Sequence, residues 1–208
     1  MPRWKPGAVD RLQTAALELF DEQGFERTTV AEIVQRAGLT QRTFFNHFAD
    51  KREVLFGLSS ELQREIIGEI AAADAALPPL EVVMRALGAV ADKLLEHRRA
   101  VVAHRYAVIA ANPELMEREL GKNAALTDAI AAALRERGGD GDDAYLAASV
   151  VMLAQQVAFR AWTRPGETRA LRELLQDALH AVRATADPAG RPEVRAGAGQ
   201  AGGRPLPA

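Results

Sequence analysis

Residues 29–53 carry the signals of two short helices joined by a turn of about three residues. Thr29 and Glu32 have the spacing of a capping box, which predicts that a helix begins here. Apolar side chains then recur at helical spacing, at Val30, Ile33, Val34 and Ala37. Gly38 suits the left-handed conformation that ends a helix, and Thr40 is placed to cap the next one. This pattern predicts a helix-turn-helix unit.

The second short helix, predicted for residues 41–48, separates aromatic from polar side chains. Phe44, Phe45 and Phe48 fall on its inner and flanking sides, and Phe44 and Phe48 are predicted core residues. The outward positions carry Gln41, Arg42, Thr43, Asn46 and His47. These side chains can hydrogen-bond base edges and phosphates, whereas a face that only confers solubility more often carries Glu and Lys. The pattern therefore predicts a helix that reads DNA.

Residues 9–56 resemble the DNA-binding domain of the tetracycline-repressor (TetR) family of transcriptional regulators. The matching segments are Thr29-Val30, Ala37-Gly38-Leu39-Thr40, Thr43-Phe44-Phe45 and Phe48 to Lys51. The resemblance is specific because it fixes spacing over more than 20 residues. Phe45 stands where the family often has tyrosine, so a phenolic contact to phosphate is lost. Gln41-Arg42 replaces a frequent Lys-Gly pair, so no base preference is carried over.

The outward face and the family positions together predict the residues that contact DNA. They are Thr29, Thr40, Gln41, Arg42, Thr43, Phe45, Asn46, His47 and Lys51. Arg42 is the first candidate for a guanine contact and Gln41 for an adenine contact, because of their bidentate geometry; contact with phosphate or solvent alone is the alternative. The resemblance implies phosphate contacts for Thr29, Thr43, His47 and Lys51. For the two threonines, local backbone capping is an alternative that is compatible with that role.

The net charge of −2 gives no indication of nucleic acid binding. Binding depends on local fields, however, and basic residues gather near the predicted turn. They are Arg3, Lys5, Arg11, Arg27, Arg42, Lys51 and Arg52. Arg3 and Lys5 belong to a proline-bounded arm that either reaches the DNA or is disordered. The chain has no cysteine, no signal-peptide pattern and no uninterrupted apolar stretch of about 18 residues, so we expect a cytoplasmic protein without a membrane span.

Helical periodicity recurs along the chain without sustained β-type alternation, which predicts an all-α fold of about nine helices. The helices are expected at residues 9–23, 29–37, 41–48, 51–74, 80–96, 99–111, 113–137, 143–164 and 167–184. We expect a helix-turn-helix domain with its arm at residues 1–50 and a larger ligand-binding and dimerisation domain at 51–186. Residues 51–76 would form a connecting helix that starts from an Asp50–Glu53 capping box. The Pro- and Gly-rich residues 187–208 are expected to be a disordered tail.

The helix predicted from residue 143 is apolar on two sides. One stripe carries Leu146, Val150, Leu153 and Val157, and the other carries Ala147, Val151, Ala154, Ala158 and Trp162. The last helix has a single stripe of Leu171, Leu174, Leu175, Ala178 and Val182. Two such helices from each of two chains would form a four-helix homodimer interface, as the family resemblance also implies. The alternative is that both helices serve the monomer core alone.

The resemblance further implies a small-molecule cavity in the second domain. Candidate lining residues are Met84, Leu87, His104, Tyr106, Met116, Gln155, Phe159 and Trp162, each of which could instead be ordinary core. Arg105 could pair with an acidic ligand. No catalytic motif or zinc pattern occurs and no cofactor is expected, so an enzyme is disfavoured. The prediction is a regulator that binds an operator in double-stranded DNA and is released by a largely apolar effector; a constitutive DNA-binding dimer is the alternative.

Overall fold

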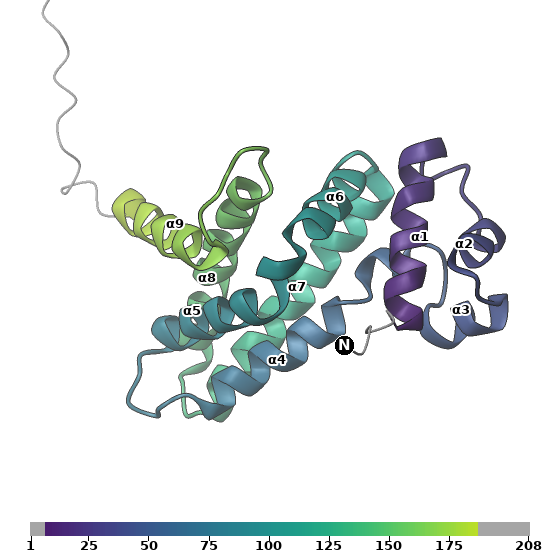
Figure 1. The fold of residues 1–208 in the computed structure, drawn as a ribbon. Helices are drawn as coiled ribbons and strands as arrows, with labels where there is room; N and C mark the ends of the chain where they lie inside the picture. The colour runs from purple at the N-terminus through teal and green to yellow at the C-terminus, as the bar shows by residue number, and fades with distance from the viewer. Residues whose placement is uncertain (1–6, 187–208) are drawn as a thin grey trace, which may run out of the picture.

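The computed structural model describes residues 7–186, which form nine α-helices and, within that range, no strand (Figure 1). The helices are α1 (Ala8–Gln23), α2 (Val30–Ala37), α3 (Gln41–His47), α4 (Ser59–Ala72), α5 (Pro79–Val90), α6 (Arg99–Ala110), α7 (Pro113–Glu136), α8 (Gly141–Trp162) and α9 (Leu171–Ala186). Short non-α turns are η1 (Glu53–Phe56), η2 (Ala91–Leu95) and η3 (Glu96–Arg98). The predicted all-α class is confirmed. The predictions for the N-terminal arm and for residues 187–208 lie outside the described residues.

The caps read from the sequence are present in the helix-turn-helix unit, which we call the reader (α1–α3). The Thr29 hydroxyl accepts from the Glu32 amide at 3.2 Å, and the Glu32 carboxylate accepts from the Thr29 amide at 2.8 Å. Gly38 ends α2 in the left-handed conformation, with φ of 63°. Thr40 caps α3 by accepting from the Thr43 amide at 3.1 Å. Local sequence therefore determines both ends of this short two-helix motif.

The hydrophobic core of the reader is completed by residues from the larger domain. Phe20, Phe44 and Phe48 are buried at its centre. The same cluster contains η1 and, from α6 and α7, the fully buried Ile109 and Leu115. The two parts of the molecule therefore share a continuous apolar contact, in the region where α1 lies beside α6 in Figure 1.

The single connecting helix predicted for residues 51–74 is wrong in its first part. Residues 51–52 form a turn, η1 is a 3₁₀-helix and α4 begins only at Ser59. In a continuous α-helix, the carbonyls of Val54 and Leu55 would accept from amides four residues ahead. Here they accept instead from Gln13 Nε2 at 3.2 Å and from Arg105 Nε. Side chains of α1 and α6 thus occupy the acceptors that the helix would need.

The larger domain is built around α8, which packs against α5, α7 and α9. Eight α8 residues are buried, among them the predicted stripe of Ala147, Val151, Ala154, Ala158 and Trp162. By length and composition alone, α8 could cross a membrane. Its burial against three helices instead accounts for its apolar sequence, because a core helix meets the same criteria.

Several helix ends differ from the predicted ones. The π-turn η2 and the 3₁₀-turn η3 replace the last turns of the helix predicted for residues 80–96. The last helix starts at Leu171 rather than at residue 167, and the Glu96 carboxylate accepts from the Leu171 amide at 2.5 Å. This cap comes from a segment 75 residues away, so no local signal for it exists in the sequence.

Candidate nucleic-acid interface and effector cavity

Helix α3 presents a polar outer face and an aromatic inner face. Gln41, Arg42, Asn46 and His47 are exposed, and Thr43 is half-buried. The predictions for the phenylalanines as core residues are confirmed, because Phe44 is 0% and Phe48 5% exposed. Phe45 is 55% exposed and its ring packs edge-on against that of Phe44. The face can therefore offer both hydrogen-bonding groups and one apolar ring edge to a groove.

Most of the basic side chains near the turn are engaged within the fold. Arg11 donates to the carbonyls of Ala37 and Gly38, at the end of α2. Arg27 donates to the Gln23 carbonyl, and Arg52 pairs with Asp50 and Glu114. Of this predicted basic set within residues 7–186, Arg42 is the member for which the structure records no side-chain partner. It is therefore the basic side chain in this set best placed to meet DNA.

Lys51 has a structural role that the sequence did not reveal. Its ammonium donates to the carbonyls of Phe25, Glu26 and Thr28, at 2.8, 3.1 and 3.1 Å. It also lies 4.3 Å from the centroid of the Phe25 ring. An ammonium has three N–H donors, and all three are used here. The predicted phosphate contact of Lys51 would require these bonds to break.

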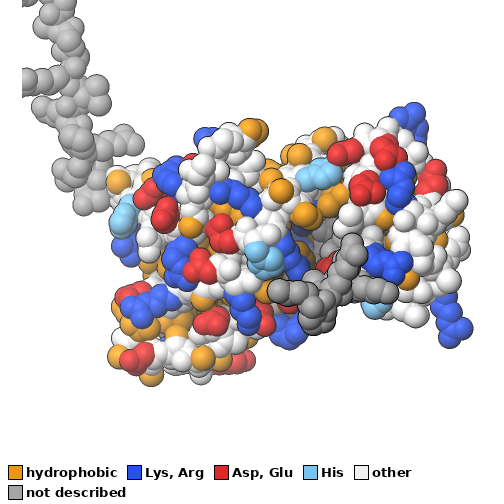
Figure 2. Space-filling model, in the orientation of Figure 1, with side chains coloured by type: hydrophobic (Ala, Val, Ile, Leu, Met, Phe, Trp, Pro, Cys, Tyr) orange, Lys and Arg blue, Asp and Glu red, His pale blue; other side chains and the backbone are white. Residues whose placement is uncertain are grey.

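The threonines predicted at the interface serve first as caps. Thr40 and Thr43 are joined through their hydroxyls at 2.9 Å, so their oxygens face the N-terminus of α3. The Thr29 hydroxyl and the Thr29 amide both donate to the Glu32 carboxylate. These bonds, with the hydroxyl contributing most, lower the pKa of that carboxyl below its usual value. Figure 2 shows acidic side chains gathered over the upper part of α1, away from α3. In this view, the acidic cluster on α1 therefore lies away from the candidate interface.

A cavity of about 310 Å³ lies in the larger domain. Its wall includes η1 and α4 through Leu55, Leu58 and Ser59, and the opposite sides come from α5 to α9. The predicted residues that line it are Leu87, Tyr106, Met116, Gln155 and Phe159. The cavity thus reaches the segment that connects the larger domain to the reader.

Three predicted lining residues lie elsewhere. Met84 packs against the core of the larger domain. His104 is hydrogen-bonded to Asp21 of α1 at 2.8 Å, so it joins the two parts of the molecule. Trp162 is fully buried beside Arg99, which donates to its carbonyl at 2.9 Å. Size and polarity identified these residues as candidates, but their direction depends on the packing of neighbouring helices.

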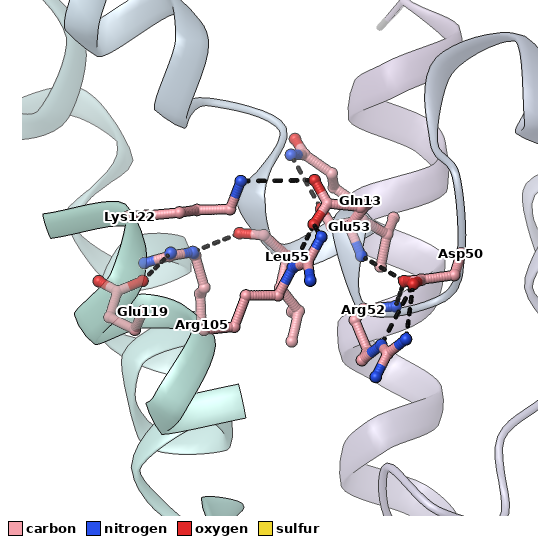
Figure 3. A network of polar contacts seen from close by, with 10 residues as sticks. Gln13, Asp50, Arg52, Glu53, Leu55, Arg105, Glu119 and Lys122 are labelled. Atoms are coloured by element: carbon pink, nitrogen blue, oxygen red, sulfur yellow. Dashed lines mark hydrogen bonds and ion pairs between the residues drawn. The ribbon is translucent and has the colours of Figure 1, made fainter. Parts of the chain in front are cut away.

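The charged groups of the cavity were mostly missed by the sequence reasoning. Arg105, Glu119 and Lys122 line it, and the first two form an ion pair at 2.8 Å with side chains only 18% and 17% exposed. Figure 3 shows this pair beside the Leu55 carbonyl, with Lys122 reaching toward Glu53. The only signal in the sequence was the i, i+3 spacing of Glu119 and Lys122 on one helix face. The Lys122–Glu53 ion pair and the Arg105–Leu55 hydrogen bond therefore join the cavity wall to η1.

The outer stripe of α8 is exposed. Leu146, Leu153 and Val157 are 59%, 50% and 50% exposed, whereas Val150 is partly buried. The corresponding prediction for α9 is wrong. Leu171, Leu174, Leu175 and Ala178 are buried in the core of the monomer, and only Val182 of that stripe is half-buried. The face that α9 leaves exposed is mostly polar.

An all-α chain with a capped helix-turn-helix unit and an apolar cavity in its second domain belongs to the class of DNA-binding transcriptional regulators. Residues 12–58 match the family model of bacterial regulatory proteins of the tetR family, and residues 77–187 match the model of the MftR C-terminal domain. The chain belongs to the TetR family.

Its relatives support the same class. The HTH-type transcriptional regulator TcmR of Streptomyces glaucescens is 30% identical over 185 residues, which are 84% of this chain and 82% of the relative. The repressor FadR of Thermus thermophilus, solved with lauroyl-CoA, is 25% identical with a TM-score of 0.55, over 84% of this chain and 93% of that chain. SmeT of Stenotrophomonas maltophilia, solved with triclosan, is 21% identical with a TM-score of 0.58, over 97% and 99%, and shares the fold.

Proposed function

We propose that this regulator is a cytoplasmic homodimeric repressor, without catalytic activity, that a small ligand releases from its operator. The observation that carries the proposal is a wall shared by the cavity and the connector, which is the segment of residues 51–58 between α3 and α4 and contains η1. Leu55 belongs both to the cavity lining and to the hydrophobic cluster of the reader. We infer that the reader can take two orientations relative to the larger domain. A ligand that binds one orientation more tightly than the other shifts the population toward it.

The dimer we propose uses the exposed stripe of α8. Leu146, Leu153 and Val157 leave a row of large apolar side chains in water, which a second copy of the chain would cover. Two readers are needed because half-sites of an operator lie in successive major grooves, roughly 34–36 Å apart. The family is dimeric, and this stripe is the apolar part of α8 that the monomer leaves exposed.

At the DNA, we propose base contacts for Gln41 and Arg42 and phosphate or sugar contacts for the surrounding face. That face comprises Thr29, Thr40, Thr43, Phe45, Asn46 and His47. Lys51 is left out of this set, since its ammonium holds the loop before α2. Arg42 is exposed and has no side-chain hydrogen bond with the described residues, so no such bond has to break when Arg42 turns toward a guanine.

The domain organisation we propose has a helix-turn-helix domain at residues 1–50, which contains the reader, and a larger domain at residues 51–186. The ligand would occupy the cavity, whose wall is mainly apolar with a few polar groups. Lauroyl-CoA and triclosan are bound by the relatives FadR and SmeT, so this fold accommodates amphipathic and apolar ligands. A constitutive DNA-binding dimer is the second candidate, and a cavity whose lining includes Leu55 of the connector favours the ligand-released form.

Selection of bound duplexes from a random library tests the DNA function directly. Wild-type protein is expected to enrich a sequence with two related half-sites. Arg42→Ala should lose preference at one base pair in each half-site, while Arg85→Ala, a change at an exposed ion pair far along the chain, should enrich the same sequence as wild type. Enrichment of no sequence by the wild-type dimer would reject the proposed function.

A further inference from the structure

Arg105 lies where the cavity, the larger domain and the connector meet. Its Nη2 pairs with Glu119 of α7, and its Nε donates to the Leu55 carbonyl. A guanidinium has five N–H donors, and the bonds recorded with the described residues use two of them. Because Arg105 also lines the cavity, the remaining donors are within reach of a bound molecule. Figure 3 shows the Leu55 carbonyl and the Glu119 carboxylate on either side of the Arg105 guanidinium.

A second cation lies beside Arg105. The Arg105 guanidinium and the Lys122 ammonium are each 5.3 Å from the centroid of the Phe56 ring. Lys122 is 3.5 Å from Glu53 of η1 and also lines the cavity. Both cations therefore reach the cavity wall next to η1.

The charge of the cavity lining is positive. Its Lys, Arg, Asp and Glu residues are three basic ones, Arg105, Lys122 and Arg160, and one acidic one, Glu119. The remainder of the wall is mostly apolar, with leucines from four helices and the rings of Tyr106 and Phe159. An anionic group on an apolar body is the chemistry that satisfies both parts of such a wall.

We propose that the effector is an amphipathic anion, and that its anionic group binds Arg105 with support from Lys122. This inference rests on the proposed function for its regulatory meaning, and it names the ligand class of the same cavity. A planar carboxylate matches the fork of the guanidinium, which makes Arg105 the specificity-determining residue. Lys122 adds a second positive charge without that geometric requirement.

The same contact gives the ligand a route to the reader. Arg105 and Lys122 hold η1 through the Leu55 carbonyl and the Glu53 carboxylate, and Arg118 also pairs with Glu53. A bound anion competes for both cations and weakens these two ties. Release of the Leu55 carbonyl allows the connector to move, because this carbonyl is the acceptor that would extend α4 backwards. Ligand binding and reader placement are thereby linked.

Calorimetric titration of the full-length dimer tests the ligand class without DNA. The probes are saturated carboxylates of about six to twelve carbons and the primary amides of the same lengths, a size range that suits a cavity of this volume. At least one carboxylate is expected to bind wild type roughly tenfold more tightly than its matched amide. The preference should fall to about onefold in Arg105→Gln and should persist in Arg85→Gln.

Arg105→Gln leaves Glu119 half-enclosed without its partner, so Arg105→Gln/Glu119→Gln is the matched variant that removes both charges. It should fold and show the same loss of preference. Equal affinity of carboxylates and amides for wild type would overturn the proposal, as would a preference that survives in both variants or carboxylates that do not bind at all. Failure of the proposed function gives a different result. Wild type would then still prefer carboxylates over amides, but no ligand would change its affinity for operator DNA.

Discussion

Lys51→Met should destabilise the reader, although the residue stands at a position where the family resemblance implies a phosphate contact. Methionine keeps most of the aliphatic stem and removes only the ammonium. The change deletes three hydrogen bonds to backbone carbonyls, of 2.8, 3.1 and 3.1 Å, and leaves the carbonyls before α2 without these donors. The stability of the folded chain, rather than DNA contact, is therefore the quantity expected to change most.

The magnitude follows from these contacts. A hydrogen bond to a charged group contributes about 1.5–3 kcal/mol, but the three share one donor group and do not add fully. The site is half-buried, so water replaces part of the loss, and the freed side chain regains up to about 2 kcal/mol of rotamer entropy. We expect a loss of about 2–4 kcal/mol in the free energy of unfolding. For a chain of this length, that lowers the melting temperature by about 5–15 °C.

Chemical denaturation followed by far-ultraviolet circular dichroism measures the effect. Arg42→Met is the matched control, because it removes a cation from the same reader at an exposed site and should change stability by less than about 0.5 kcal/mol. The reasoning is refuted if Lys51→Met unfolds like wild type but binds every DNA sequence more weakly and with a flatter salt dependence. That result would assign Lys51 to phosphate.

Three further predictions concern the interface, the connector and α4. Leu153→Glu and Val157→Glu should give folded monomers in light scattering because they charge the exposed α8 stripe. Leu175→Arg should instead unfold the chain, because Leu175 is 2% exposed. Dimers of both α8 variants would reject the interface. For Asp50, burial raises the pKa, but hydrogen bonds from the Arg52 side chain and from the Glu53 and Arg52 amides outweigh burial and hold the pKa below its usual value. Its stabilisation is therefore present above about pH 4 and lost as pH falls through the folded pKa, so Asp50→Asn should cost about 1 kcal/mol near pH 7 and progressively less in acid; a pH-independent difference in denaturation curves would contradict this. Gly68→Ala, where a new Cβ meets no atom within 4 Å, should stabilise α4 by about 0.5–1 kcal/mol, and a lower melting temperature would show that the glycine is needed.

The parts of the fold that were predicted correctly have local causes. The capping box at Thr29, the left-handed Gly38 and the Thr40 cap each depend on residues within three or four positions, so the sequence of the reader predicts its geometry. The buried stripe of α8 also follows from periodicity alone. These signals do not require knowledge of how helices pack.

The features that were missed depend on residues distant in sequence. The break before α4 arises from Gln13 and Arg105, which lie 41 and 50 residues from their acceptors. The apolar stripe of α9 was predicted to face a second chain, but it packs within its own chain. Periodicity does not say to which chain the covering helix belongs. The ion pairs at the cavity wall likewise become visible only when α6 and α7 are placed beside η1. Tertiary packing decides all three.

The cavity and the operator site are coupled through the connector in the function we propose. The most direct test of this coupling is calorimetric titration of a compound that raises the melting temperature of the dimer, with and without the selected operator. Coupling must be reciprocal, so operator should weaken ligand binding by the same factor by which ligand weakens operator binding, roughly 5- to 150-fold for a coupling of about 1–3 kcal/mol. Identical ligand affinities in the two titrations would contradict the account and leave a constitutive DNA-binding dimer.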